Sequence, residues 1–349
     1  MRVGLLTSGG DCQSLNAMME SICKSIFKLD PECEIYGFVD GYQGLQNGEY
    51  NIYQCEDFFD LLYRGGTVLG TSRTSFKNIV KSRNVVDSMV QTYKDCQLDC
   101  LLALGGNGSQ KTSNLLSKKG CNVIAFPKTI DNDLYGTDIT FGFLSAFESA
   151  SKVMEAIYST ASSHNRIFMV EIMGHYTGWL TLYTGLACQA NMILIPEIPY
   201  KKEIIIEKLN NRDRTKPYII VIAEGAISYE DSLLSFRALK EKKKYHKSAM
   251  KDLRYELKNE IDETIYTNTP GHIQRGGPPS SMDQLLVARI GSYAGQMIQN
   301  KEFGYMLASQ NEKIVKIPLD EVAGKLKYVN LDNPMIEEAR NLGISFGDK

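Results

Sequence analysis

Short apolar runs, each ended by glycine or a turn residue, alternate along the chain with longer amphipathic stretches. The runs occupy residues 1–7, 34–38, 100–104, 121–126, 166–172, 192–195 and 217–223. Runs of this length indicate buried strands, and the stretches between them indicate helices. Strands that alternate with helices predict an α/β fold with doubly wound, mostly parallel sheets.

Three of the predicted strands run directly into polar turns rich in glycine, aspartate and asparagine. The turns are SGGD (8–11), GGNGS (105–109) and PKTIDND (127–133). Ligands of doubly wound sheets bind beyond the carboxyl ends of the strands, so we expect these turns to meet in one crevice. A chain of 349 residues is longer than a domain with a single hydrophobic core usually is. We therefore predict two lobes with a cleft between them.

Composition narrows the function classes. The net charge of -2, with 23% charged residues, gives no general basic field, so nucleic acid is not expected as a partner. The lysine-rich segment 239–254 is read as a solvated helix face, since no matching basic stripe accompanies it. The apolar run at residues 1–7 is too short for a signal peptide or a membrane span. We therefore expect a cytoplasmic protein without membrane contact.

The cysteines do not form a recognisable metal motif. Cys96 and Cys100 have no second pair at zinc-ligand spacing, so free buried thiols are the better interpretation. The eight cysteines are Cys12, Cys23, Cys33, Cys55, Cys96, Cys100, Cys121 and Cys188.

The turn GGNGS precedes an amphipathic helix that starts near Ser109, so its backbone N–H groups can point at a phosphate. Gly108 lets a bulky phosphate approach the backbone, and Ser109 can donate its hydroxyl. A tight turn without a ligand would give the same pattern, and the turn lacks the lysine of a Walker A loop.

The turn at 127–133 carries more specific chemistry. Asp131 and Asp133 follow a buried strand, and two carboxylates cannot both enter the core without a large desolvation cost. One can accept a proton from an attacking hydroxyl while the other orients Mg²⁺, with Lys128 and Thr129 near the transferring group. A lone Asp-Asn-Asp turn can also simply end a strand.

A third signal is GHIQRGG at 271–277, where His272 and Arg275 lie between glycines. Together they could clamp a sugar phosphate, although His272 alone could be a structural histidine.

These turns, in this order, resemble those of the phosphofructokinase family over nearly the whole chain. The similar segments are 1–16 (MRVGLLTSGGDCQSLN), 64–73 (RGGTVLGTSR), 103–109, 127–133, 163–178 (SHNRIFMVEIMGHYTG), 223–225 and 272–277. The resemblance implies a two-lobed fold, with 1–140 and about 274–306 forming a donor-binding lobe. The remainder, about 141–273 and 307–349, would form a sugar-phosphate-binding lobe.

The resemblance also implies residue roles. Asp131 would take the proton from the 1-hydroxyl of fructose 6-phosphate, with Thr129, Asp133 and Arg73 as its catalytic partners. The donor and its Mg²⁺ would meet Gly10, Tyr42 (near the nucleotide base), Arg73, Asn107, Gly108, Ser109 and Lys128, with Asn107 and Asp133 at the metal. The sugar phosphate would meet Thr129, Asp131, Met173, Gly174, His175, Glu224, His272 and Arg275, with Arg166 reaching the substrate of a neighbouring subunit.

Several positions depart from the family pattern. This chain has Asn107 where the family pattern has aspartate, and it has His175 and Tyr266 where the pattern has arginine. It has Gln13-Ser14 where the pattern has Pro-Gly. Asn107 and His175 resemble variants of a bacterial subgroup. Glu20 stands where the family's effector site has an arginine, so an anionic effector of the usual kind is not expected.

Two residues bear on the phosphoryl donor. Gly108 leaves room for the α-phosphate of ATP, where the pyrophosphate-using branch carries an aspartate, whereas Lys128 resembles that branch. We weight the steric argument and predict a glycolytic, ATP-dependent 6-phosphofructokinase that forms a homotetramer or homodimer. The alternatives are the same reaction with pyrophosphate and a catalytically weak paralogue that binds sugar phosphate as a regulatory subunit.

Overall fold

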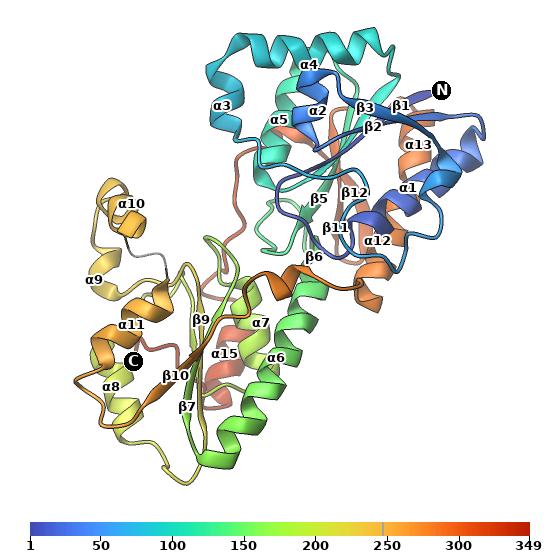
Figure 1. Cartoon of the computed structure of the whole chain (residues 1–349). Helices are drawn as coiled ribbons and strands as arrows, with labels where there is room; N and C mark the ends of the chain where they lie inside the picture. The colour runs from blue at the N-terminus through green and yellow to red at the C-terminus, as the bar shows by residue number, and fades with distance from the viewer. Residues whose placement is uncertain (246–247) are drawn as a thin grey trace. The chain divides into compact units, whose positions relative to one another are not determined.

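The computed structural model describes residues 1–245 and 248–349, and it divides the chain into two compact units. The first unit comprises Met1–Ala146 and Arg275–Lys327, and the second comprises Phe147–Gln274 and Tyr328–Lys349. Both units are α/β, as the alternation of apolar runs predicts (Figure 1).

The first unit is built on an eight-stranded sheet in the order β12-β11-β5-β4-β1-β2-β3, with β6 paired to β5. Its strands are β1 (Arg2–Ser8), β2 (Glu34–Phe38), β3 (Tyr50–Gln54), β4 (Cys100–Gly105), β5 (Val123–Thr129), β6 (Phe141–Gly142), β11 (Tyr305–Gln310) and β12 (Lys313–Pro318). The central pairs are parallel, and only the pairs β2/β3 and β11/β12 are antiparallel. Parallel strands need helical crossovers, which cover the sheet and bury it.

The helices of this unit are α1 (Leu15–Leu29), α2 (Tyr42–Asn47), α3 (Phe76–Lys81), α4 (Arg83–Asp95), α5 (Asn107–Lys118), α12 (Ser281–Gly291), α13 (Ala294–Gln299) and α14 (Leu319–Val322), with a 3-10 turn η1 at Cys55–Phe58. Helices α1, α12 and α13 pack together, and Gly291 makes room for α1 because a Cβ there would lie 2.5 Å from Ser21. A hydrophobic core lies between the sheet and the helices α2, α4 and α5, and it includes Phe38, Met89 and Leu101.

The second unit has a four-stranded parallel sheet in the order β10-β7-β9-β8, formed by β7 (Ile167–Ile172), β8 (Met192–Leu194), β9 (Tyr218–Ala223) and β10 (Ile265–Asn268). Its helices are α6 (Phe143–His164), α7 (Trp179–Ala187), α8 (Lys202–Asn210), α9 (Tyr229–Ser232), α10 (Phe236–Tyr245), α11 (Ala249–Leu257) and α15 (Pro334–Asn341), and the 3-10 turn η2 (Gly271–Arg275) ends at the unit boundary. Figure 1 shows α8 and α11 on one side of this sheet and α7 and α15 on the other.

The observed units differ from the sequence-based boundaries in two segments, 141–146 and 307–327, which both belong to the first unit. Residues 141–146 include β6, which pairs with β5. Residues 307–327 were assigned to the second lobe, but β11 and β12 extend the sheet of the first unit. The reason is local: β11 pairs parallel with β5, and β12 folds back on β11 as a hairpin. The half-exposed side chains of β12 gave no buried apolar run to predict this.

The cysteines are all free, and seven of the eight are buried. This confirms the prediction of free buried thiols. Within the described ranges, no helix combines the length and apolar character needed to cross a bilayer.

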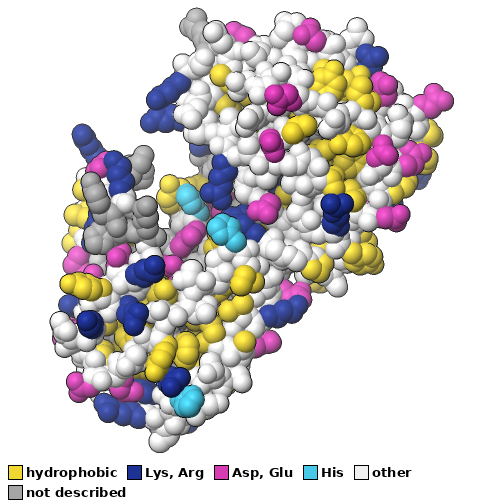
Figure 2. Space-filling view, in the orientation of Figure 1, with side chains coloured by type: hydrophobic (Ala, Val, Ile, Leu, Met, Phe, Trp, Pro, Cys, Tyr) yellow, Lys and Arg dark blue, Asp and Glu magenta, His cyan; other side chains and the backbone are white. Residues whose placement is uncertain are grey.

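Charged side chains of both signs are interspersed on the face shown in Figure 2. In the lysine-rich segment 239–254, Lys242 pairs with Asp231 and Lys244 with Glu241, while α11 buries Leu253. Residues 246 and 247 of this segment lie outside the described residues.

Candidate active site

The predicted phosphate-binding turns leave one edge of the first sheet. Strands β1, β4 and β5 are adjacent and parallel, and their register places Ser8 opposite Gly105 and Gly105 opposite Pro127. The three following turns therefore start level with one another. The turns at 105–109 and 131–133 thus follow neighbouring strands at the same edge of the sheet.

The first turn is tied to the loop at 64–73. The Gly9 N–H donates to the Ser72 carbonyl over 3.0 Å, and the Thr71 hydroxyl donates to the Gly9 carbonyl over 2.8 Å. Arg73 follows directly and is exposed. These bonds hold the segment that carries Arg73 next to the first turn.

The turn at 105–109 leads into α5, whose N-cap is Gly106. No side chain caps this helix end, so N–H groups of the first turn remain for a ligand. The partial positive charge of a helix N-terminus favours an anion at this point. Gly108 is exposed, and no described atom beyond its chain neighbours and the nearby helix backbone lies within 4 Å of where its Cβ would be.

Two predicted donor-binding side chains take a supporting position instead. Tyr42 was expected near the nucleotide base, but its ring is buried in the core beneath α5. Its hydroxyl lies 2.8 Å from the Ser113 hydroxyl and donates to the Ser109 carbonyl, while the Ser109 hydroxyl donates to Tyr42. An aromatic side chain that finds a polar partner for its hydroxyl is stable in a core, which the sequence pattern did not reveal. Tyr42 and Ser109 therefore hold the turn from beneath.

Asn107 has an unusual environment. Its amide nitrogen donates to the Lys325 carbonyl over 3.3 Å, whereas its buried Oδ1 has no hydrogen-bond partner within the described residues. A buried acceptor without a donor is costly, and most such atoms have a partner in a folded protein. The side chain thus presents an oxygen that suits a metal ion or a metal-bound water.

The catalytic turn is shaped by its own hydroxyl. The Asp131 N–H donates to Thr129 Oγ1 over 3.1 Å, and the Thr140 hydroxyl donates to the Thr129 carbonyl over 2.7 Å. Asp131 is half-buried, whereas Asp133 is buried. Burial and the neighbouring charge of Asp131 raise the pKa of Asp133 to about 7, because both disfavour a second carboxylate.

Lys128 brings a buried positive charge to the same edge. Its ammonium donates to the Gly10 carbonyl, and burial lowers the pKa of Lys128 to about 8. Asp131 and Asp11 contribute the opposing attraction. A lysine held here can neutralise a phosphate that binds between the first turn and Asp131.

Arg275 also lies at the first turn. Its guanidinium donates to the Asp11 carbonyl over 2.8 Å, and a Cβ at residue 10 would lie 2.5 Å from it, so a side chain there would have to displace the arginine. The predicted partner of Arg275, His272, is exposed and belongs to the second unit.

Sequence reasoning missed Lys327, which fastens the catalytic turn. The Lys327 ammonium donates to Asn132 Oδ1, the Thr137 carbonyl and the Asp138 carbonyl over 3.0, 2.9 and 2.7 Å. Its N–H donates to the Asp133 carbonyl over 2.8 Å. Burial lowers the pKa of Lys327 to about 8. No motif marked it, because 195 residues separate it from Asn132.

Asp283 of α12 is a second missed residue. It is fully buried and accepts hydrogen bonds from the N–H groups of Gly142 and Ser145 and from the Ser145 hydroxyl. It thereby fixes the chain that returns beside Thr129 in β6. The Ser-x-x-Asp sequence at 280–283, a helix-start signal, was the available clue.

In the second unit, Glu224 organises the predicted sugar-binding turn. Its Oε1 accepts the N–H groups of His175 over 2.7 Å and Gly174 over 3.3 Å. The Met173 N–H donates to Gln274 Oε1 over 3.3 Å, a contact that sequence reasoning missed. His175 has a φ of 53°, so the turn is held in the left-handed region by these bonds.

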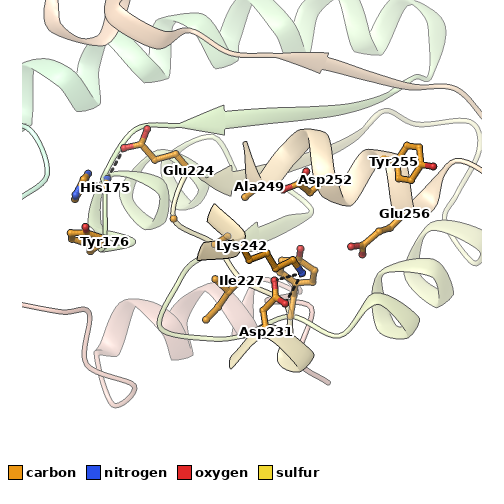
Figure 3. A pocket seen from close by; sticks show the side chains of 13 residues that line it. His175, Tyr176, Glu224, Ile227, Asp231, Lys242, Ala249, Asp252, Tyr255 and Glu256 are labelled. Carbon is orange, nitrogen blue, oxygen red and sulfur yellow. Dashed lines mark hydrogen bonds and ion pairs between the residues drawn. The ribbon is translucent and has the colours of Figure 1, made fainter. Parts of the chain in front are cut away.

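A pocket of about 640 Å³ opens beside this turn (Figure 3). His175, Tyr176 and Glu224 line one side, and Asp231, Lys242, Asp252 and Glu256 line the side formed by α9, α10 and α11. Figure 3 shows Lys242 paired with Asp231 across from Glu224. Of the residues predicted to bind the sugar, His175 and Glu224 line this pocket.

Glu171 holds one wall of this region. It is buried in β7, and its Oε1 accepts the Ser248 hydroxyl over 2.8 Å and the Met250 N–H over 3.2 Å at the start of α11. Burial raises the pKa of Glu171. A carboxylate within an apolar strand was a signal that the sequence offered.

Comparisons with known proteins identify similar chains. A model of the phosphofructokinase family matches residues 2–298. The ATP-dependent 6-phosphofructokinase of Spirochaeta thermophila is 43% identical, over 99% of this chain and 97% of the relative. ATP-dependent 6-phosphofructokinase 3 of Bacteroides thetaiotaomicron is 40% identical, over 99% of this chain and the whole relative.

Solved structures show the same fold. Pichia pastoris phosphofructokinase in the T-state matches with a TM-score of 0.78 and 28% identity, over 92% of this chain and 35% of the much longer Pichia chain. A pyrophosphate-dependent phosphofructokinase from Nitrosospira multiformis matches with a TM-score of 0.82 and 18% identity, over 99% of this chain and 92% of that chain. At that identity the likeness concerns the fold alone.

Proposed function

Because the chain belongs to the phosphofructokinase family, we propose that it transfers the γ-phosphoryl group of ATP to the 1-hydroxyl of fructose 6-phosphate. The products are fructose 1,6-bisphosphate and ADP, as in glycolysis. The observation that carries this proposal is the uncapped N-terminus of α5 at the same sheet edge as the Asp131 turn. The N-terminus of α5 binds a donor phosphate, and Asp131 removes a proton from the sugar.

The chemistry follows from these residues. The oxygen of the sugar 1-hydroxyl attacks the γ-phosphorus of ATP, and the Asp131 carboxylate accepts the hydroxyl proton. The bond between the γ-phosphorus and the oxygen that bridges it to the β-phosphate breaks. Thr129 holds Asp131 in place through the hydrogen bond to its N–H. The Lys128 ammonium and the α5 N–H groups stabilise negative charge on the transferring group.

The donor proposed is ATP, and the open surroundings of Gly108 support it. A pyrophosphate donor is the second candidate, because Lys128 lies buried at the phosphate edge. Lys128 is compatible with either donor, whereas a side chain at residue 108 would crowd only ATP, which is longer than pyrophosphate. We therefore place more weight on Gly108.

Mg²⁺ suits the side chains at the turns. Asn107 offers an unpartnered buried oxygen, and Asp133 offers a carboxylate. Within the described residues no three His, Cys, Asp or Glu side chains are grouped to hold a metal. This agrees with Mg²⁺ in phosphoryl-transfer sites, which keeps waters and substrate phosphates among its ligands. Bound there, the ion would neutralise phosphate charge.

The sugar phosphate is proposed to bind Met173, Gly174, His175, Glu224 and His272 of the second unit, together with Arg275. The pocket at His175 and Glu224 supports this assignment. We also propose a cytoplasmic homo-oligomer, either tetramer or dimer, in which Arg166 contacts the sugar phosphate of a neighbouring copy. Eight free cysteines fit a reducing compartment.

The test is an assay of the purified chain with fructose 6-phosphate and either ATP or pyrophosphate. Fructose 1,6-bisphosphate is measured through aldolase and a dehydrogenase that oxidises NADH. We expect formation with ATP and Mg²⁺ at a kcat/KM well above that with pyrophosphate. No product with either donor would refute the proposed activity, and a preference for pyrophosphate would refute the donor.

A further inference from the structure

Three side chains form a stack on one face of the second unit's sheet. Tyr266 of the edge strand β10 lies opposite Phe168 of β7, and Arg166 precedes Phe168 by two residues. Side chains two apart on a strand share a face. The neighbours Ile167 and Ile265 point the other way, into the core with α8 and α11.

The stack has defined geometry. The Arg166 guanidinium carbon lies 4.5 Å from the centre of the Tyr266 ring. The Tyr266 and Phe168 rings are stacked, with centres 5.4 Å apart and planes inclined by 25°. All three side chains are half-buried, so the guanidinium is partly accessible.

The guanidinium of Arg166 has no anionic partner in the part of the chain that the structure describes. Among the described residues, no hydrogen bond or ion pair engages its guanidinium, whereas Arg212 and Arg340 of the same unit pair with Glu263 and Asp348. Stacking engages the face of a guanidinium and leaves the N–H groups at its edge free. The arrangement therefore holds a cation in place while it keeps its donors available for an anion.

We propose that Tyr266 is a positioning residue, which holds the Arg166 guanidinium in the orientation that binds the sugar phosphate of a neighbouring copy. This rests on the role given to Arg166 in the proposed function. The ring restricts the rotamers of a long side chain, so less freedom is lost when the phosphate binds. Tyr266 thereby offsets part of the loss of the arginine that the family has at this position.

The experiment is a double-mutant cycle on the full chain. Tyr266→Leu removes the ring but keeps an apolar cover on Phe168, and Tyr266→Phe keeps the stack without the hydroxyl. Because a cation–π contact at a partly exposed site is weak, we expect Tyr266→Leu to raise the KM for fructose 6-phosphate about three- to fivefold. Neither kcat nor the KM for ATP should change, and Tyr266→Phe should resemble the unmodified protein.

The second arm uses Arg166→Ala alone and combined with Tyr266→Leu, with oligomer size checked by light scattering. We expect the double variant to have the KM of Arg166→Ala, because the tyrosine acts only through the arginine. An unchanged KM in Tyr266→Leu, or an equal further rise in the Arg166→Ala background, would overturn the positioning role alone. No turnover by the unmodified chain would overturn the proposed activity and this role together.

Discussion

Replacing Gly108 with aspartate would place a carboxylate in the first turn of α5, where the α-phosphate of ATP is proposed to pass. The fold should accept it. Gly108 is exposed, its backbone is outside the left-handed region, and no described atom beyond its chain neighbours and the nearby helix backbone lies within 4 Å of its Cβ position. An acidic residue near a helix N-terminus stabilises the helix by about 0.3–1 kcal/mol. A loss of ATP use would therefore report on the ligand and not on unfolding.

The size of the effect follows from Coulomb's law. Two unit charges 4 Å apart repel by about 4 kcal/mol at an effective dielectric constant of 20. Since each 1.36 kcal/mol corresponds to about a factor of ten, kcat/KM for ATP should fall by about a thousandfold. Pyrophosphate has no third phosphate or nucleoside to pass residue 108, so its kcat/KM should fall less.

The assay compares kcat/KM for both donors and the melting temperature of Gly108→Asp. Gly108→Asn is the matched control, because it adds nearly the same volume without charge. ATP use in the asparagine variant should lie between that of the aspartate variant and the unmodified protein. An aspartate variant that melts normally and keeps kcat/KM for ATP within tenfold would refute the reasoning.

Three further expectations follow from the two units. Lys128→Met should lower kcat by about a hundredfold, because it removes a charge proposed to stabilise the transferring group, and steady-state rates with saturating substrates check this. Lys327→Met removes three hydrogen bonds to the loop of the catalytic turn and should lower both the melting temperature and kcat, while an unchanged KM for ATP shows that donor binding is intact. Light scattering at micromolar concentration should give a mass at least twice 39.1 kDa, and a fully active monomer would contradict the role of Arg166.

The sequence predicted the sheet edge well, for a physical reason. Strands buried on both faces give unbroken apolar runs, and glycine or aspartate directly after them marks the carboxyl end where ligands bind. The turns at Gly10, Gly105 and Asp131 were found in this way, and the parallel register brings them level.

The features that the sequence did not predict depend on contacts distant along the chain. Strand β3 is mostly exposed and β12 half-exposed, so neither shows an apolar run. The family resemblance implies a place near the nucleotide base for Tyr42, and no local sequence pattern indicates its hydrogen bonds to Ser109 and Ser113 of α5. Lys327 acts through three oxygen atoms nearly two hundred residues away, which leaves no local pattern.

The central claim is that Asp131 is the base at a phosphoryl-transfer turn, and Asp131→Asn tests it most directly. The measurement is kcat with saturating ATP and fructose 6-phosphate, alongside calorimetric binding of the sugar phosphate. Removal of a general base while the shape is kept should lower kcat by about two to four orders of magnitude, and sugar binding should stay largely intact. A variant that turns over at the rate of the unmodified protein would contradict the account and move the base elsewhere.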